Sequence, residues 1–74
     1  MALGIEIGNT LTKVGIPVRS YNDPEMNDNT WIVEHLRELA SYIESKNPKI
    51  YKVGTETSTQ YGASFYIEHF NQHN

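Results

Sequence analysis

The chain contains no cysteine, so it has no disulfide bond, no thiolate ligand for a metal and no thiol nucleophile. Small secreted domains commonly depend on disulfides, because a short chain buries only a small core. We therefore expect a protein of a reducing compartment, and the predicted location is the cytoplasm.

Long apolar runs are also missing. The longest uninterrupted apolar stretch is three residues, far below the roughly 20 that a membrane-spanning helix needs. No basic region precedes the first apolar residues, and position 2 is Ala2 rather than the glycine that myristoylation requires. These absences predict a soluble chain with no signal peptide, no lipid anchor and no membrane contact.

Positive charge is scarce. Six lysines and arginines stand against nine aspartates and glutamates, which gives a formal net charge of −3 at pH 7. Affinity for nucleic acid depends on neutralising many phosphates with basic side chains, so this composition disfavours nucleic acid as a partner.

The chain does contain enough apolar material for one small core, since 38% of its 74 residues are hydrophobic and 11% are aromatic. These fractions are ordinary for a globular domain and argue against disorder. We expect residues 1–74 to form a single small domain.

Residues 2–16 are predicted to form a β-hairpin, because apolar residues alternate on both sides of Gly8-Asn9, a dipeptide typical of two-residue turns. With Gly8 and Asn9 at the turn centre, Ile5 is expected to face Thr12 across the hairpin. This register places one set of side chains on a common face: Leu3, Ile5, Ile7, Thr10, Thr12 and Val14.

Residues 17–29 predict a loop, since proline, asparagine and aspartate are concentrated there. The next segment, 30–45, is predicted to be an α-helix with Asp28 or Asn29 as its N-cap. Its apolar residues recur three and four positions apart, which places them on one stripe facing a sheet: Ile32, Leu36, Leu39, Ala40 and Ile43.

Residues 50–70 return to alternation and predict a second hairpin, whose turn lies between Ser58 and Gly62. The polar tail 71–74 is expected to fray. Two hairpins and one helix give an α+β domain of ββαββ order, a four-stranded antiparallel sheet with the helix packed on one face. The expected core is Leu3, Ile5, Ile7, Val14, Ile16, Ile32, Leu36, Leu39, Ile43, Val53, Phe65 and Ile67.

One segment is similar to a known family. Residues 4–15, GIEIGNTLTKVG, resemble the first phosphate-binding hairpin of the actin-like, sugar-kinase-like ATPases, in which an acidic residue precedes a Gly-x-Thr turn. The resemblance implies that Glu6 takes the place of the metal-binding acid and that Gly8, Asn9 and Thr10 form the phosphate turn. The same residues are also those of an ordinary hairpin turn, in which glycine and asparagine adopt positive φ.

No catalytic pattern accompanies these residues. The sequence has no paired carboxylates at catalytic spacing, no Gly-x-Ser-x-Gly motif and no Walker-type loop. His35 is expected to pack beside Trp31 on the helix, and strand alternation would separate the imidazoles of His69 and His73. We therefore predict a non-enzymatic protein with no catalytic residue, no metal site and no cofactor.

Large rings are abundant, with five tyrosines, two phenylalanines and one tryptophan. Tyrosine and tryptophan commonly anchor protein interfaces, and one helix over four strands cannot cover all eight rings. We therefore expect self-association, most simply a homodimer, and a protein partner. The predicted partner-binding residues combine exposed rings with an acidic loop: Tyr21, Asp23, Glu25, Asp28, Trp31, Tyr42, Tyr66 and Phe70.

The predicted function is that of a small binding protein, an inhibitor or regulator that occupies a surface of a larger protein and that a virus or mobile element encodes. The alternative is a protein that binds or sequesters a small ligand, a phosphate or a nucleotide. In that case Gly8, Asn9 and Thr10 would line a site at an oligomer interface.

Overall fold

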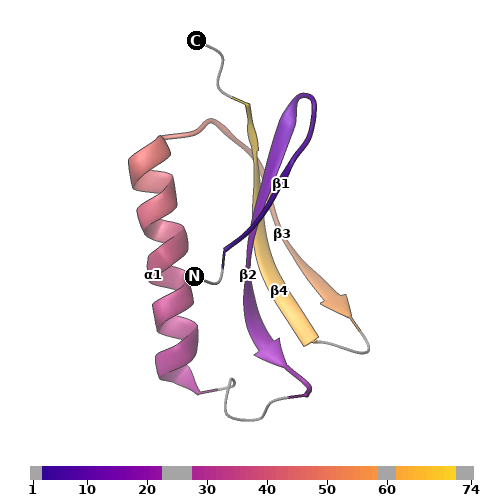
Figure 1. Cartoon of the computed structure of the whole chain (residues 1–74), viewed down its shortest axis with the longest axis vertical. Helices are drawn as coiled ribbons and strands as arrows, with labels where there is room; N and C mark the ends of the chain where they lie inside the picture. Colours follow the sequence, from indigo (N-terminus) through magenta and orange to yellow (C-terminus); the bar gives the residue numbers. More distant parts are fainter. Residues whose placement is uncertain (1–2, 23–27, 59–61, 72–74) are drawn as a thin grey trace.

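The computed structural model describes residues 3–22, 28–58 and 62–71, which form one open sheet with one helix beside it (Figure 1). All neighbouring strands are antiparallel, and their order is β1-β2-β4-β3, so the two hairpins join through β2 and β4. The predicted ββαββ architecture is confirmed. Its elements are β1 (Gly4–Ile7), β2 (Leu11–Ser20), α1 (Asn29–Lys46), β3 (Ile50–Ser58) and β4 (Gly62–Phe70).

Asp28 and Asn47 cap the two ends of α1. The Asp28 carboxylate accepts a hydrogen bond from the Thr30 amide at 3.1 Å, as an N-cap does. At the other end Asn47 adopts the left-handed conformation, with φ 46°, and its amide donates to the Ile43 carbonyl. The helix is therefore one residue longer at each end than the predicted 30–45, and it is the only described helix. No helix in the described ranges is long and apolar enough to cross a bilayer.

The first hairpin has a different register from the predicted one. Ile5 pairs with Val14 and not with Thr12, and the central residues of the turn are Asn9 and Thr10. The register differs by two residues, and because side chains alternate with a period of two, each residue of the hairpin keeps its predicted face.

Gly8 provides the physical reason for this register. Its amide donates to the Leu11 carbonyl at 2.9 Å, and a side chain at position 8 would come within 2.8 Å of that oxygen. Glycine is required here by this close approach and not by a positive φ, which among the described glycines only Gly62 adopts. The expected turn with Gly8 and Asn9 at its centre is therefore wrong.

β2 continues through Pro17 to Ser20, where the sequence predicted the start of a loop. β1 begins at Gly4, opposite Gly15, so Pro17 lies beyond the part of β2 that pairs with β1 and next to a bulge. A strand tolerates a residue without an N–H at such a position. The residues 23–27 of the predicted loop lie outside the described part of the chain.

Asn71, the last residue that the structure describes, is anchored, although the tail 71–74 was expected to fray. The Asn71 side chain donates to the Gly8 carbonyl at 2.8 Å, and its backbone amide donates to the Thr10 carbonyl at 2.8 Å. The Thr12 hydroxyl in turn donates to the Asn71 side-chain oxygen. These bonds tie the end of β4 to the first turn, while residues 72–74 lie outside the described part.

The core is smaller than predicted. Its central cluster has four buried apolar side chains, and five more pack around them half-buried. The backbone of α1 lies against β2 and against no other described strand, so the two edge strands fall outside the area that the helix covers. The buried four are Val14, Ile16, Leu39 and Ile67, and the half-buried five are Leu3, Val18, Tyr42, Ile43 and Phe65.

Four predicted core residues are therefore exposed. Ile5 and Ile7 of β1 are 48% and 79% exposed, and Val53 of β3 is 55% exposed. Leu36 of α1 is 45% exposed, because it lies on the flank of the helix and not on the stripe that faces β2.

Candidate functional site

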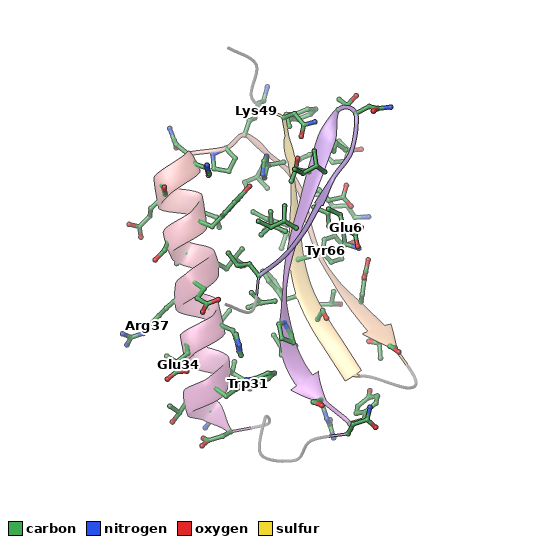
Figure 2. The ribbon with its side chains drawn as sticks, viewed as in Figure 1. Glu6, Trp31, Glu34, Arg37, Lys49 and Tyr66 are labelled. Atoms are coloured by element: carbon green, nitrogen blue, oxygen red, sulfur yellow. The ribbon has the colours of Figure 1, made fainter. Side chains whose placement is uncertain are left out.

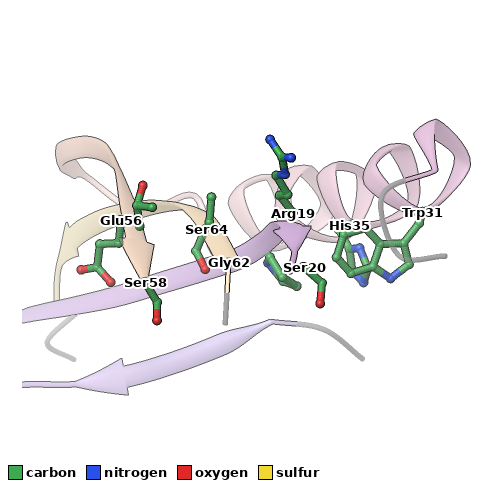
Figure 3. Close-up of a pocket in the computed structure, with 11 residues that line it drawn as sticks. Arg19, Ser20, Trp31, His35, Glu56, Ser58, Gly62 and Ser64 are labelled. Atoms are coloured by element: carbon green, nitrogen blue, oxygen red, sulfur yellow. The ribbon is translucent and has the colours of Figure 1, made fainter. Parts of the chain in front are cut away.

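A pocket of about 420 Å³ lies where β2 and β3 end, β4 begins and α1 starts (Figure 3). This volume is within the range of pockets that hold small organic ligands. Four elements line it with one arginine, two aromatic rings and several hydroxyls, among them Arg19, Trp31, His35, Thr57, Ser58 and Ser64.

A bulge in β2 sets the direction of Arg19, whose side chain points away from those of Ser20, Ser58 and Ser64 (Figure 3). Pro17 pairs with Ser64 and Arg19 pairs with Ala63, so Val18 is an extra residue in the strand. Without it, position 19 would share a face with Pro17, the face turned away from α1. With it, Val18 packs against the core and Arg19 lies on the same side of the sheet as α1.

Gly62 lets β4 start close to the end of β2. It is buried and has φ +135°, and a side chain built on it would come within 2.0 Å of the Arg19 carbonyl oxygen. Both the backbone conformation and the contact exclude any other residue without rearrangement. Gly62 and the bulge together fix the backbone that carries Arg19.

His35 is the unusual group in the pocket wall. It is 8% exposed, and its Nδ1 atom is buried without a hydrogen-bond partner among the described residues. Its ring meets the Trp31 ring edge to face, with centroids 4.3 Å apart. A buried polar atom without a partner costs about 1–3 kcal/mol, so this nitrogen lowers the stability of the fold.

The other buried histidine, His69, is fully bonded. Its Nδ1 lies 2.9 Å from the Phe70 carbonyl oxygen, which can only accept, so Nδ1 carries the proton. Its Nε2 lies 2.7 Å from the Tyr42 hydroxyl, which donates to it. Burial raises the pKa of Tyr42 and so keeps this donor protonated. Tyr42, a predicted partner-binding residue, is thus engaged within the fold.

Tyr66 lies on the side of the sheet away from α1, as does Glu6 (Figure 2). It is nevertheless only 7% exposed, because its ring lies over Gly54 of β3, where a side chain would come within 2.7 Å of the Tyr66 hydroxyl. The Lys13 ammonium, which forms an ion pair with Glu56, stands 4.5 Å from the ring centroid. The expectation that Tyr66 is an exposed ring is therefore wrong.

The remaining predicted partner residues do not form one surface. Trp31 lies at the pocket, whereas half-buried Phe70 lies at the other end of β4, where its ring contacts Tyr51. Tyr21 is 46% exposed. Asp28 is exposed and caps α1. The last two acidic residues of this set, Asp23 and Glu25, lie outside the described residues.

The proposed phosphate turn is at the opposite end of β2 from the pocket. The Gly8 amide donates to Leu11, so it is not free to meet a phosphate, and Asn71 occupies the carbonyls of Gly8 and Thr10. No group of three potential metal-ligating side chains exists among the described residues, so Glu6 has no such partners there for holding a metal ion. The geometry thus fits the hairpin-turn interpretation of these residues better than the ATPase resemblance.

Exposed apolar side chains gather on the α1 side of the sheet. Leu3, just before β1, lies against the flank of α1 that carries Glu38 and Ser41. At 100° per residue, Leu36 falls on the opposite flank, next to buried His35 and Leu39, whereas Val33 falls on the outer side of the helix. We call Leu36, together with Ile50 and Val53 of β3, the apolar flank; they are exposed by 45%, 39% and 55%, respectively.

Comparison with known proteins adds no relative. A scan against protein-family models, a search of curated proteins and a search of solved structures each returned no match. The functional argument therefore depends on the geometry of this chain alone.

Proposed function

We propose that the protein is a non-enzymatic binding domain, an inhibitor or regulator that acts by occupying a surface of a larger protein. The observation that carries this proposal is the apolar flank. Clustered apolar side chains that stay exposed on a small domain are typical of protein-binding surfaces. Val53 and Leu36 are the two most exposed residues of the apolar flank.

The open edge of β3 indicates how the partner binds. β3 has nine residues, contains no proline and has no described strand on its outer side, whereas β1, at the other edge, has four residues. An uncovered edge strand offers backbone donors and acceptors to an added strand. We therefore expect the partner to contribute an extended segment beside β3.

The side chains of β3 define the chemistry of that segment. Val53 projects to the α1 side of the sheet, and Lys52 and Glu56 project to the other side, as their pairing with β4 requires. A complementary segment places apolar residues on one face, against Val53 and Leu36, and polar or charged residues on the other.

The experiment compares Val53→Lys with Ile7→Lys. Both replace an exposed β-branched residue on an edge strand and on the same face of the sheet, so both should preserve the fold. Immobilised wild-type protein and Ile7→Lys should retain the same partner from a lysate of the native host. Val53→Lys should retain at least about tenfold less, since a buried, unpaired lysine is strongly unfavourable in an interface.

Two results would overturn the proposal. One is equal retention of the partner by Val53→Lys and the wild type. The other is a wild-type dimer in light scattering that Val53→Lys dissociates, with no other protein retained, because the apolar flank would then be covered by a second copy of the chain.

A further inference from the structure

We propose that the outer edge of β1 is a self-association surface, on which β1 of a second copy of the chain pairs antiparallel with Ile5 opposite Ile5. The two four-stranded sheets then continue as one across a two-fold axis. This surface lies at the edge of the sheet opposite to β3, so the inference does not depend on the proposed function.

The first argument is the backbone of β1, which presents free hydrogen-bonding groups at this edge. The Gly8 amide donates to the Leu11 carbonyl, and hydrogen-bonded pairs recur at every second residue pair of an antiparallel hairpin. The peptide groups of Ile5 and Ile7 therefore point away from β2. No described strand lies on the outer side of β1, and α1 lies against β2 alone among the described strands. Such an edge is a template for a further strand.

The second argument is the side chains that accompany these free groups. Ile5 and Ile7 project to the α1 side of the sheet and are 48% and 79% exposed, and Ile7 is the most exposed large apolar side chain among the described residues. Leu3 precedes them on the same face and packs half-buried against the core. No charge interrupts this row and β1 contains no proline, two features that protect many free edges.

The third argument is the register, which charge selects. Two copies that share one sheet pair residues of the same face, so the symmetric pairing at the centre of β1 is either about Ile5 or about Glu6. Pairing about Glu6 sets two carboxylates directly opposite each other, which is unfavourable. Pairing about Ile5 sets Ile7 against Leu3 of the second copy, so apolar side chains meet on the α1 side. On the other side (Figure 2), Glu6 meets Gly4 and no like charge.

Gly4 is a residue that this register explains and the isolated fold does not. Its φ is not positive, since Gly62 is the only described glycine in that region, and a side chain built on Gly4 would meet no atom closer than 4.0 Å. Glycine inside a strand lowers stability and often marks a place where another backbone approaches closely. In the proposed pairing, Glu6 of the second copy stands directly beside Gly4.

The helices leave room for this pairing. α1 lies over β2, and three strand spacings separate β2 of one copy from β2 of the other, so the two helix axes are about 14 Å apart. Helices in contact are about 8–10 Å apart, so the two copies of α1 do not collide. The apolar side chains of both β1 strands lie in the space between them.

Sedimentation equilibrium at micromolar to millimolar concentrations tests the pairing. One short strand per copy buries less than the roughly 1,200–2,000 Å² of a standard interface, so we expect a reversible monomer–dimer equilibrium of the wild type. Ile5→Lys and Ile5→Glu each set like charges opposite each other and should weaken the dimer at least tenfold. An equimolar mixture of the two variants should associate more tightly than either variant alone, because lysine then faces glutamate.

Val53→Lys is the matched control, since Val53 is a β-branched residue of similar exposure on the same face of the other edge strand. It should dimerise as the wild type does. Thermal unfolding verifies that each variant is folded. Hydrogen exchange of the wild type needs no variant: the amides of Ile5 and Ile7 should gain more protection with rising concentration than the amide of Glu6, which faces β2.

Four results would each overturn the proposal. They are a wild-type monomer at every concentration, a dimer that Val53→Lys dissociates and Ile5→Lys does not, a mixture of Ile5→Lys and Ile5→Glu no more associated than the separate variants, and exchange of the Ile5 and Ile7 amides that does not depend on concentration.

Discussion

Replacing His35 with phenylalanine should stabilise the protein, although the residue is buried. The substitution removes a polar atom that has no partner among the described residues, and such an atom costs about 1–3 kcal/mol. The additional ring atom must fit into a closely packed site, which offsets part of this gain. The edge-to-face contact with Trp31 can be retained by the new ring. We expect a net gain of about 1 kcal/mol in the free energy of unfolding.

His69→Phe is the matched control, since both histidines are buried in the same fold. This substitution removes two hydrogen bonds and leaves the Tyr42 hydroxyl and the Phe70 carbonyl without their partner. The expected loss is about 2–4 kcal/mol. The same chemical change should therefore have opposite signs at the two positions.

Thermal unfolding of the two variants and the wild type, under identical conditions, measures the two effects. For a domain of this size 1 kcal/mol corresponds to about 4–8 °C in Tm, so His35→Phe should raise Tm by a few degrees and His69→Phe should lower it by more. Urea unfolding provides the corresponding free energies. If His35→Phe destabilises the protein as much as His69→Phe does, then Nδ1 of His35 has a partner in solution and the reasoning is refuted.

Three further predictions concern the core, a cap and a titration. Leu39→Ala should cost about 2–5 kcal/mol, because Leu39 is 4% exposed, whereas half-exposed Leu36→Ala should cost less than about 1 kcal/mol; equal losses in urea unfolding would contradict the position of α1 over β2. Asp28→Ala should cost about 0.5–2 kcal/mol through loss of the N-cap bond to Thr30, and an unchanged Tm would contradict that cap. Burial raises the pKa of Tyr42 above its ordinary value of 10.0, so the unfolded chain loses this proton first as pH rises. Stability from this group should be present below about pH 10 and lost as pH rises through the folded pKa, and Tyr42→Phe should show a smaller loss between pH 9 and 11.

The elements and their order could be predicted from the sequence because local signals agree with the fold. Alternation of apolar residues predicted both hairpins, and apolar residues three and four positions apart predicted the helix between them. Asp28 was also one of the two predicted N-caps. The register of the first hairpin could not be predicted, because Gly8-Asn9 fits more than one turn. The choice depends on the lack of room for a side chain at position 8, which would come within 2.8 Å of the Leu11 carbonyl oxygen, and this is a property of the folded backbone.

Burial was predicted less well, for a reason of geometry. Apolar periodicity shows which face of an element is apolar, but not which strand a helix lies over. Leu36 and Val53 fit the predicted stripe and strand face, and they are exposed because α1 is centred on β2. Tyr66 was expected to be exposed because its sheet face lacks a helix, and Gly54 on the neighbouring strand, a contact distant in sequence, buries it.

The pocket could not be predicted as a site, because its decisive features are not local. Trp31 and His35 are four apart on a predicted helix, so their contact could be expected from the sequence. The direction of Arg19 depends on the bulge at Val18, and no single residue type marks a bulge in that strand.

His35 and the apolar flank depart from what stability alone would favour, and both departures have the same structural origin. A helix centred on a single strand buries four large side chains tightly and leaves one apolar edge without a cover. The same placement brings Trp31 and His35 to the end of β2, where an imidazole nitrogen is enclosed without a donor or acceptor among the described residues. Neither feature adds to the stability of the isolated chain, and one unsatisfied buried atom costs about 1–3 kcal/mol. Both are therefore places where the local chemistry and the fold disagree, which is expected at functional or strained sites.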